Sequence, residues 1–152
     1  KLEWDMSHRL MTKDGKKFYD KNKCGSLHGH RYVADISFLS QKTDEFGFVV
    51  DFSVLKNKIK TWIDTHWDHA TLVGYHDFQL ATFLGDETDK YYSMPMDTTT
   101  SAESIAKHLF DVIEKLMVEG HIINDGHLTL YKVSIYETPT STASYFKLPY
   151  VK

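Results

Sequence analysis

The sequence predicts an α+β domain in which a four-stranded antiparallel sheet carries two antiparallel helices on one face, in the order ββααββ. Stretches of alternating apolar residues lie near both ends of the chain, and two stretches with a helical period lie between them. The segment 73–97 has no steady period, so we expect an irregular excursion there. At 152 residues the chain fits a single domain spanning 1–152.

The composition is that of an ordinary globular protein, with 41% hydrophobic residues, 26% charged residues and a net charge of −3. This balance offers no general attraction to phosphate backbones, so we expect no nucleic-acid partner. No apolar run approaches the roughly 20 residues of a membrane span, and no signal sequence opens the chain. We therefore expect a soluble cytoplasmic protein without a membrane partner. The single cysteine, Cys24, agrees with a reducing compartment.

The first predicted strand alternates from residue 2 to residue 10. Its apolar face holds Leu2, Trp4, Met6, His8 and Leu10. His8 is the one polar member of that row. A lone inward histidine is more often a satisfied core residue than a ligand, so its role depends on what the neighbouring strand places beside it.

The second predicted strand begins at His28 and runs to about residue 40. His28 and His30 are two positions apart, so both side chains point to the apolar face of this strand. Taken alone, a His-Gly-His sequence is explained as the start of a strand. If this strand pairs with the first, His8 joins the two histidines, and three ligands with an open fourth position are typical of catalytic zinc. We therefore predict a Zn²⁺ site at these three residues.

After a turn at 41–47, the segment 48–50 is predicted to return as a hairpin strand. The period then changes, and an amphipathic helix is predicted to begin at Ser53 as its N-cap and to end near Asp68 and His69. An adjacent Asp-His pair at a helix end is usually a surface pair, so on its own this pattern is a weak signal of function.

The second predicted helix opens at Thr100 and Ser101, with Glu103 at the spacing of a capping box, and stops at Gly120. Capping is the simplest explanation of these polar residues. A long strand follows at 127–137, and a final strand at 143–150.

Glu137 closes the apolar row of Val133 and Ile135, so it is either exposed at the end of the strand or held there to bind a ligand. The sheet face away from the helices lacks cover. We expect Trp, Tyr, Phe and Ile on that face and therefore predict a homo-oligomer.

Six short motifs occur in order along the chain. They are Ser7-His8-Arg9-Leu10, Cys24-Gly-Ser-Leu-His28-Gly-His30, Gly47-Phe-Val-Val-Asp51-Phe52, Asp68-His69 with Leu72, Ser101-Ala-Glu103, and Glu137-Thr138. Together they resemble the 6-pyruvoyl-tetrahydropterin synthase and 6-carboxy-5,6,7,8-tetrahydropterin synthase family. The resemblance implies the tunnelling fold (T-fold), in which subunits join their sheets into a trimeric barrel and two trimers usually form a hexamer.

By position, the resemblance implies that His8, His28 and His30 bind zinc and that Cys24 is the proton acceptor. The four-residue step from Cys24 to His28 is similar to that of the bacterial carboxytetrahydropterin synthases of queuosine biosynthesis. The implied reaction converts 7,8-dihydroneopterin triphosphate to 6-carboxy-5,6,7,8-tetrahydropterin, acetaldehyde and triphosphate, which would make the protein a carbon–carbon lyase.

The resemblance also implies roles for residues outside this cluster. Asp68 and His69 would form a catalytic proton relay near the cysteine, and Glu137 would anchor the pterin ring and take part in catalysis. Thr100 and Ser101 match positions that contact the pterin, although the family commonly has proline at the position of Thr100.

Three alternatives remain open at the level of sequence. The chain resembles the pyruvoyl synthases too, which eliminate triphosphate and are carbon–oxygen lyases. A pterin-binding T-fold protein without turnover would be expected to lack Cys24, His69 or a zinc histidine, and none is missing. A zinc-stabilised scaffold would use the three histidines only to hold strands together, but such structural sites are normally closed by four ligands.

Overall fold

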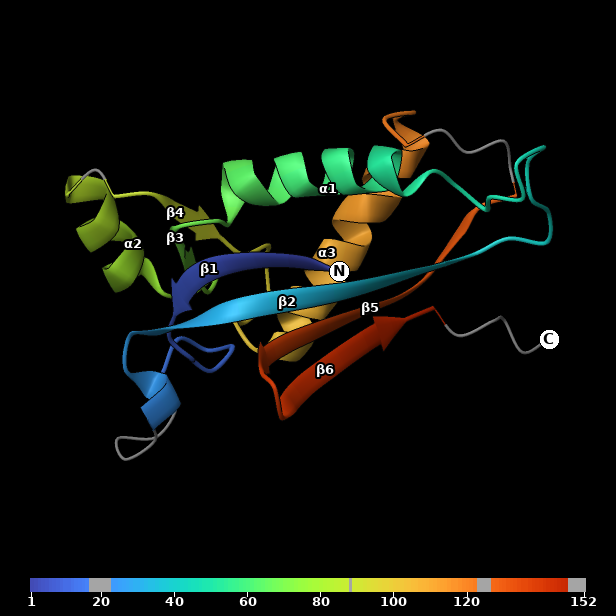
Figure 1. Cartoon of the computed structure of the whole chain (residues 1–152). Coiled ribbons are helices and arrows are strands. Elements are labelled where there is room, and N and C mark those ends of the chain that lie inside the picture. Colours follow the sequence, from blue (N-terminus) through green and yellow to red (C-terminus); the bar gives the residue numbers. More distant parts are fainter. Residues whose placement is uncertain (17–22, 88, 123–126, 148–152) are drawn as a thin grey trace.

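The computed structural model describes residues 1–16, 23–87, 89–122 and 127–147 (Figure 1). The strands are β1 (Leu2–His8), β2 (His28–Leu39), β3 (Ala70–Val73), β4 (Tyr91–Ser93), β5 (Thr129–Thr138) and β6 (Ser141–Phe146). The helices are α1 (Phe52–His66), α2 (Phe78–Asp86), α3 (Ala102–Val118) and the short 3-10 helix η1 (Lys23–Gly25). The α+β class predicted from the sequence is confirmed.

The long strands pair in the predicted antiparallel manner. β1 pairs with β2, β2 with β5, and β5 with β6. In the β1–β2 pair, His8 lies opposite His28 and Met6 lies opposite His30. This register places the last residue of β1 beside the first residues of β2, because antiparallel neighbours run past each other in opposite directions.

The helices α1 and α3 cover the same face of this sheet (Figure 1). Their buried residues pack against the inward residues of β1, β2 and β5, with Trp67 and Tyr32 among the largest completely buried side chains. Trp4 stacks on Tyr32 at a ring-centroid distance of 5.7 Å. The core therefore lies between the sheet and the two predicted helices.

The prediction of a four-stranded sheet was wrong, because the described residues form a six-stranded sheet of order β4-β3-β1-β2-β5-β6. β3 pairs with the end of β1 and β4 pairs with β3, both in parallel. The segment 73–97 is likewise not an irregular excursion, since it contains α2 and β4. Strands of three or four residues and a nine-residue helix are too short to produce a recognisable period.

Two further details differ from the prediction. The segment 48–50 is not a strand, because Asp44 accepts hydrogen bonds from the backbone N–H groups of Phe46 and Phe48 and closes the loop on itself. The N-cap of α1 is Asp51 rather than Ser53, and its carboxylate accepts the Ser53 N–H at 2.7 Å. The last strand was predicted at 143–150, of which 148–150 lie outside the described residues.

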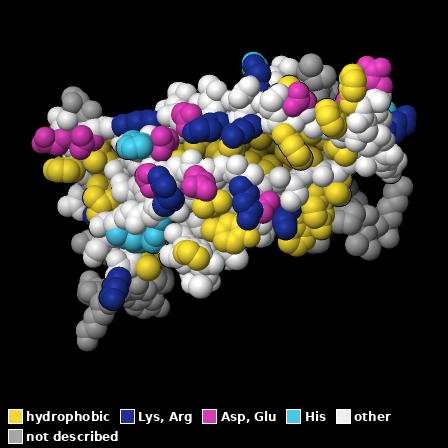
Figure 2. Space-filling model, viewed as in Figure 1, with side chains coloured by type: hydrophobic (Ala, Val, Ile, Leu, Met, Phe, Trp, Pro, Cys, Tyr) yellow, Lys and Arg dark blue, Asp and Glu magenta, His cyan; other side chains and the backbone are white. Residues whose placement is uncertain are grey.

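The sheet face away from the helices is mainly polar, contrary to the expectation of Trp, Tyr, Phe and Ile there. Strand alternation turns Trp4 and Tyr32 toward the helices, while Asp5 and Arg31 point outward and form an ion pair at 3.1 Å. Figure 2 shows charged side chains of both signs mixed with hydrophobic ones on the side facing the viewer. Because this face is mainly polar, it gives no argument that the protein must oligomerise to bury apolar surface.

Candidate functional site

The three histidines predicted as metal ligands converge at one end of the β1–β2 pair. One ligand nitrogen from each of His8, His28 and His30 can be chosen so that all lie within 4.8 Å of one another. The ring centroids of His8 and His28 are 4.6 Å apart, and those of His28 and His30 are 5.0 Å apart. The register and the two-residue strand period produce this cluster.

His8 is the most constrained of the three side chains. It is 2% exposed, and its Nδ1 lies 2.9 Å from the carbonyl oxygen of Thr100. Because a carbonyl oxygen can only accept, Nδ1 carries the hydrogen and Nε2 keeps its lone pair. Burial lowers the pKa of His8 to about 4, against the opposing effect of the bond to Thr100. The ring is therefore neutral near pH 7.

The other two histidines have matching properties. His28 Nδ1 lies 2.7 Å from the carbonyl oxygen of Ser26, so Nδ1 carries the hydrogen that this oxygen accepts. Burial also lowers the pKa of His30, so a neutral ring is favoured there as well. Neutral imidazoles oriented by a backbone carbonyl are the usual nitrogen ligands of zinc.

The buried Nε2 atom of His8 has no hydrogen-bond partner among the described residues. A buried nitrogen that lacks a partner is costly unless a ligand satisfies it. The described residues therefore fit a divalent metal with three nitrogen ligands and an open position.

Glu137, at the end of the row of Val133 and Ile135, lies beside this cluster. Its Oε1 is 3.9 Å from His8 Nε2 and 3.4 Å from the hydroxyl of Tyr32, which donates to it. Its side chain is 23% exposed, so one side of the carboxylate remains open to the cavity. The carboxylate can therefore accept hydrogen bonds from a bound ligand.

Cys24 lies in η1 and lines the same cavity as the histidines and Glu137. The carbonyl of Cys24 accepts the Leu10 N–H at 2.8 Å, which ties this helix to the segment after β1. The cavity has a volume of about 500 Å³. Its lining consists of His8, Leu10, Cys24, His28, His30, Ser101, Ala102, Glu103, Glu137, Thr138, Thr140, Ser141, Thr142 and Ala143.

The two polar residues before α3, Thr100 and Ser101, have different surroundings. Ser101 lines the cavity and is the N-cap, accepting the Ser104 N–H at 3.4 Å. Thr100 is completely buried, and its hydroxyl donates to the carbonyl of Arg9 at 2.8 Å. The Thr100 side chain is thus buried in the protein interior and does not line the cavity.

Asp68 and His69 lie away from this cavity. His69 has the left-handed φ of 58°, and its side chain is 78% exposed beside the Asp68 carboxylate at 3.1 Å. Asp5 fixes this corner, because its N–H donates to Asp68 and its carbonyl accepts the His69 N–H. Although burial opposes it, hydrogen bonding from Asp5 and His69 lowers the pKa of Asp68.

His69 lines a second cavity of about 510 Å³ together with residues of β1 and β2, among them Asp5 and Arg31. His30 lines both this cavity and the histidine cavity. Cys24 does not line the second cavity. Of the residues predicted for the site, the structure therefore brings together the three histidines, Cys24, Glu137 and Ser101. His69 shares a cavity with only one of these residues, His30, and Asp68 lines neither cavity.

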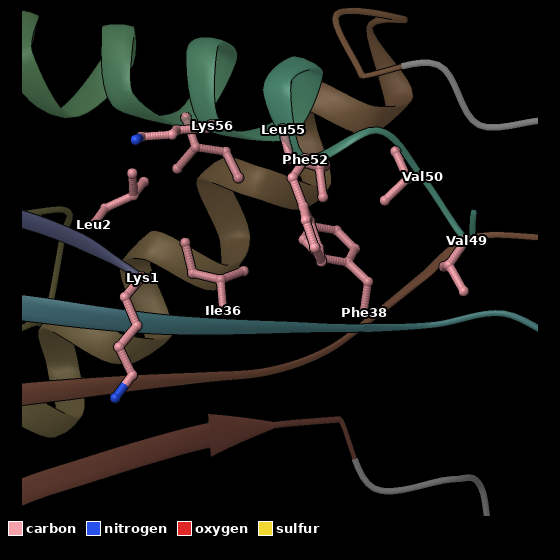
Figure 3. A pocket seen from close by; sticks show the side chains of 10 residues that line it. Lys1, Leu2, Ile36, Phe38, Val49, Val50, Phe52, Leu55 and Lys56 are labelled. Carbon is pink, nitrogen blue, oxygen red and sulfur yellow. The ribbon is translucent and has the colours of Figure 1, made fainter. Parts of the chain in front are cut away.

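Another hollow lies between α1 and β2 (Figure 3), with a volume of about 520 Å³. Apolar side chains such as Phe38 and Val50 line it, and its only ionisable side chains are Lys1 and Lys56. Without an acid, a base near neutral pH or a metal ligand, it offers no chemistry comparable to that of the histidine cavity.

The sequence interpretation missed the position of one cavity residue, Glu103, and of one buried residue behind the cavity wall, Tyr32. Glu103 was assigned to capping but lines the cavity, and the residue at the matching cap position is Ser104. Tyr32 was counted only as an apolar neighbour, although its hydroxyl reaches Glu137. Its position on the same strand face as His28 and His30 was the available signal.

Comparison with known proteins gives consistent matches. A model of the 6-pyruvoyl tetrahydropterin synthase family matches residues 1–147. The chain is 33% identical over 142 residues to the 6-carboxy-5,6,7,8-tetrahydropterin synthase of Rickettsia conorii, covering 91% of each chain. It is 34% identical over 127 residues to the synthase of the same name from Aquifex aeolicus, covering 82% of this chain and 76% of that one.

Solved structures support the fold. An uncharacterized protein from Wolinella succinogenes matches with a TM-score of 0.72 at 18% identity, over 97% of this chain and 95% of that one. The 6-pyruvoyl tetrahydropterin synthase of Caenorhabditis elegans matches with a TM-score of 0.65 at 22% identity, over 97% and 91%. The fold and the relatives together define a T-fold pterin synthase. The chain belongs to the 6-pyruvoyl tetrahydropterin synthase family, as its motifs indicated.

Proposed function

We propose that this protein is a zinc-dependent 6-carboxy-5,6,7,8-tetrahydropterin synthase, a carbon–carbon lyase acting on 7,8-dihydroneopterin triphosphate in queuosine biosynthesis. The products would be 6-carboxytetrahydropterin, acetaldehyde and triphosphate. The observation that carries this proposal is the cavity in which three histidines, Cys24 and Glu137 meet. Relatives named for this reaction, at about one-third identity, support it.

His8, His28 and His30 would hold the zinc ion. When bound, zinc would supply Lewis acidity toward the hydroxyl oxygens of the substrate side chain. Cys24, in the same cavity, would remove a proton from the adjacent carbon as a thiolate.

Glu137 would orient the pterin ring. The 2-amino group and the neighbouring ring N–H of a pterin are two adjacent donors, and one carboxylate presents two matching acceptor oxygens. The Tyr32 hydroxyl already donates to Oε1, which holds the carboxylate at the cavity wall. Ser101 also lines the cavity and would contact the substrate.

Asp68 and His69 would act on the substrate from a neighbouring subunit. Within one chain His69 lines a different cavity from Cys24, and the His69 side chain is largely exposed beside Asp68. A homo-oligomer, a trimer or a hexamer, would let the pair of one subunit complete the cavity of another. His69, oriented by the Asp68 carboxylate, would then move protons on the side of the substrate away from Cys24.

We also propose a cytoplasmic location and no nucleic-acid partner, which suit a small-molecule enzyme with a net charge of −3. Among the described residues, no helix is both long enough and apolar enough to cross a membrane.

The second candidate reaction is the elimination of triphosphate to give 6-pyruvoyl-tetrahydropterin. It is favoured by the name of the matching family model and by the C. elegans structure. Both reactions would use the same metal ligands and the same thiol. The two candidates therefore differ in product and not in the residues required.

The test combines metal analysis with identification of products. Wild-type protein should contain about one zinc per chain and should convert 7,8-dihydroneopterin triphosphate to 6-carboxytetrahydropterin, detected by mass spectrometry. His28→Ala should lose both the metal and the product, whereas His121→Ala, at an exposed histidine, should lose neither. Formation of the pyruvoyl product would select the second candidate, and full zinc occupancy in His28→Ala would refute the ligand assignment.

A further inference from the structure

Thr100 and the His8–Arg9 segment hold each other by two hydrogen bonds. The carbonyl of Thr100 accepts from His8 Nδ1 at 2.9 Å, and the hydroxyl of Thr100 donates to the carbonyl of Arg9 at 2.8 Å. Thr100 is completely buried and His8 is 2% exposed. Because the second bond fixes the backbone that carries His8, the two bonds together leave the imidazole little freedom.

Arg9 is held from its other end by the segment before α2. Its Nε and Nη2 atoms donate to the two carboxylate oxygens of Asp77 at 2.7 and 2.6 Å. The Asp77 side chain is 1% exposed, and its Oδ1 also accepts the Leu80 N–H as the N-cap of α2. A buried bidentate pair of this kind has a narrow geometry. The start of α2 is therefore joined to the end of β1, one residue beyond His8.

We propose that Thr100 and Asp77 are positioning residues of the metal site, which hold His8 in the tautomer and orientation that presents Nε2 to the metal. This inference rests on the metal-binding part of the proposed function. A carbonyl that accepts from Nδ1–H selects the ligating tautomer, and such outer contacts typically change metal affinity by about 10- to 100-fold. The segment 73–97 thereby acquires a role, since it supplies Asp77.

The main variant is Thr100→Val, which keeps the side-chain shape and the carbonyl but removes the hydroxyl bond to Arg9. The zinc dissociation constant, measured by competition with a chromophoric chelator at neutral pH, should rise by about 10-fold or more. Thr100→Ser keeps the hydroxyl and should bind zinc nearly as tightly as the wild type. Thr61→Val is the matched control, because the Thr61 hydroxyl also donates to a carbonyl, that of Asn57 in α1.

A second measurement separates positioning from a general loss of stability. In metal-free wild-type protein, nitrogen NMR of the imidazoles should show His8 protonated at Nδ1 only. Thr100→Val should show a mixture of His8 tautomers, while Thr61→Val should not.

Asp77→Asn, which removes the charge facing Arg9, should also weaken zinc binding. All affinities are compared at a temperature where circular dichroism shows each variant folded.

The outcomes are distinct. A lower melting temperature in Thr100→Val with unchanged zinc affinity and an unchanged His8 tautomer would overturn the inference and leave the proposed function intact. If Thr100→Val binds zinc more weakly than the wild type but the wild type forms no pterin product, the inference would be supported and the proposed reaction refuted. A wild type that binds no zinc would overturn both.

Discussion

The cavity at His8 and the corner at His69 are built by the same strand, yet they place a histidine in opposite environments. His8 is 2% exposed, bonded to a backbone carbonyl, and has a pKa lowered to about 4 by burial. The His69 side chain is 78% exposed and lies beside a carboxylate. A buried neutral ring suits metal ligation, whereas an exposed ring beside a carboxylate is free to exchange protons.

The residues proposed for catalysis are therefore divided between two cavities of the single chain. The inward side of β1 carries the metal ligand, and the backbone of Asp5 on that strand fixes the Asp68–His69 corner elsewhere. Separation of the two groups within one chain is explained if they meet across a subunit boundary. The following predictions test that interpretation, beginning with the largest expected effect.

The first prediction concerns Cys24 and His69 together. Cys24→Ala and His69→Ala should each lose about 100- to 10,000-fold in kcat, the usual contribution of a general base or acid, while retaining zinc. If the two residues act in different subunits, mixing the two inactive variants under conditions of subunit exchange should restore part of the activity. Activity is measured from product formation on the mixed and unmixed samples.

The control for this experiment is the double variant mixed with wild type, which should gain no activity beyond dilution of the wild-type subunits. If mass spectrometry of the intact oligomer shows that subunits have exchanged but no activity returns, the interpretation that two subunits share one active site is wrong. The histidine cavity would then be the active site, and the Asp68–His69 pair would be an ordinary surface feature.

The second prediction concerns the ring anchor in the cavity. Glu137→Gln replaces one acceptor oxygen by a donor and should weaken pterin binding by about 2 to 5 kcal/mol, as for other buried charge pairs that lose one partner. Calorimetric titration of zinc-loaded protein with sepiapterin measures this. Zinc content should not change, since the carboxylate is 3.9 Å from His8 Nε2. Equal affinities for wild type and variant would place ring recognition elsewhere.

The smallest expected effect concerns the strands β3 and β4, which follow the Asp68–His69 pair in the chain. His108 of α3 forms a 2.9 Å hydrogen bond with the Tyr92 hydroxyl of β4, and β4 pairs with β3, which follows His69. Burial lowers the pKa of His108 below its ordinary value of 6.5, so the folded protein binds this proton less readily than the unfolded chain. The stability that depends on neutral His108 is therefore fully present above about pH 6.5 and is lost as the pH falls below that value.

Metal-free protein should therefore lose thermal stability between pH 7 and pH 5 more steeply than His108→Gln, which cannot titrate. Hydrogen exchange should show the added opening in β3 and β4 and not at the β1–β2 pair, which carries the cavity. An identical pH dependence in the wild type and the variant would mean that other groups govern acid sensitivity. Asp111, Lys107 and His66 are the charged or titratable neighbours that influence His108.

The sequence by itself determined the inward histidines and the elements that carry them. The period of two in β1 and β2 placed His8, His28 and His30 on one face, because alternation is a local property of an extended chain. The helices α1 and α3 followed from their 3.6-residue period, and the stop of α3 followed from Gly120, whose left-handed φ of 75° agrees with that role. The motifs also indicated the family correctly.

Only the tertiary structure decided which polar residues share a cavity. The β1–β2 register put His8 beside His28, and the docking of α3 put the Thr100 carbonyl on the His8 ring. The strands β3 and β4 and the helix α2 were not recognised, because elements this short are defined by long-range pairing and not by local periodicity. His69 and Cys24 likewise line different cavities because of long-range contacts, such as those of Asp5 with Asp68 and His69, which no local pattern encodes.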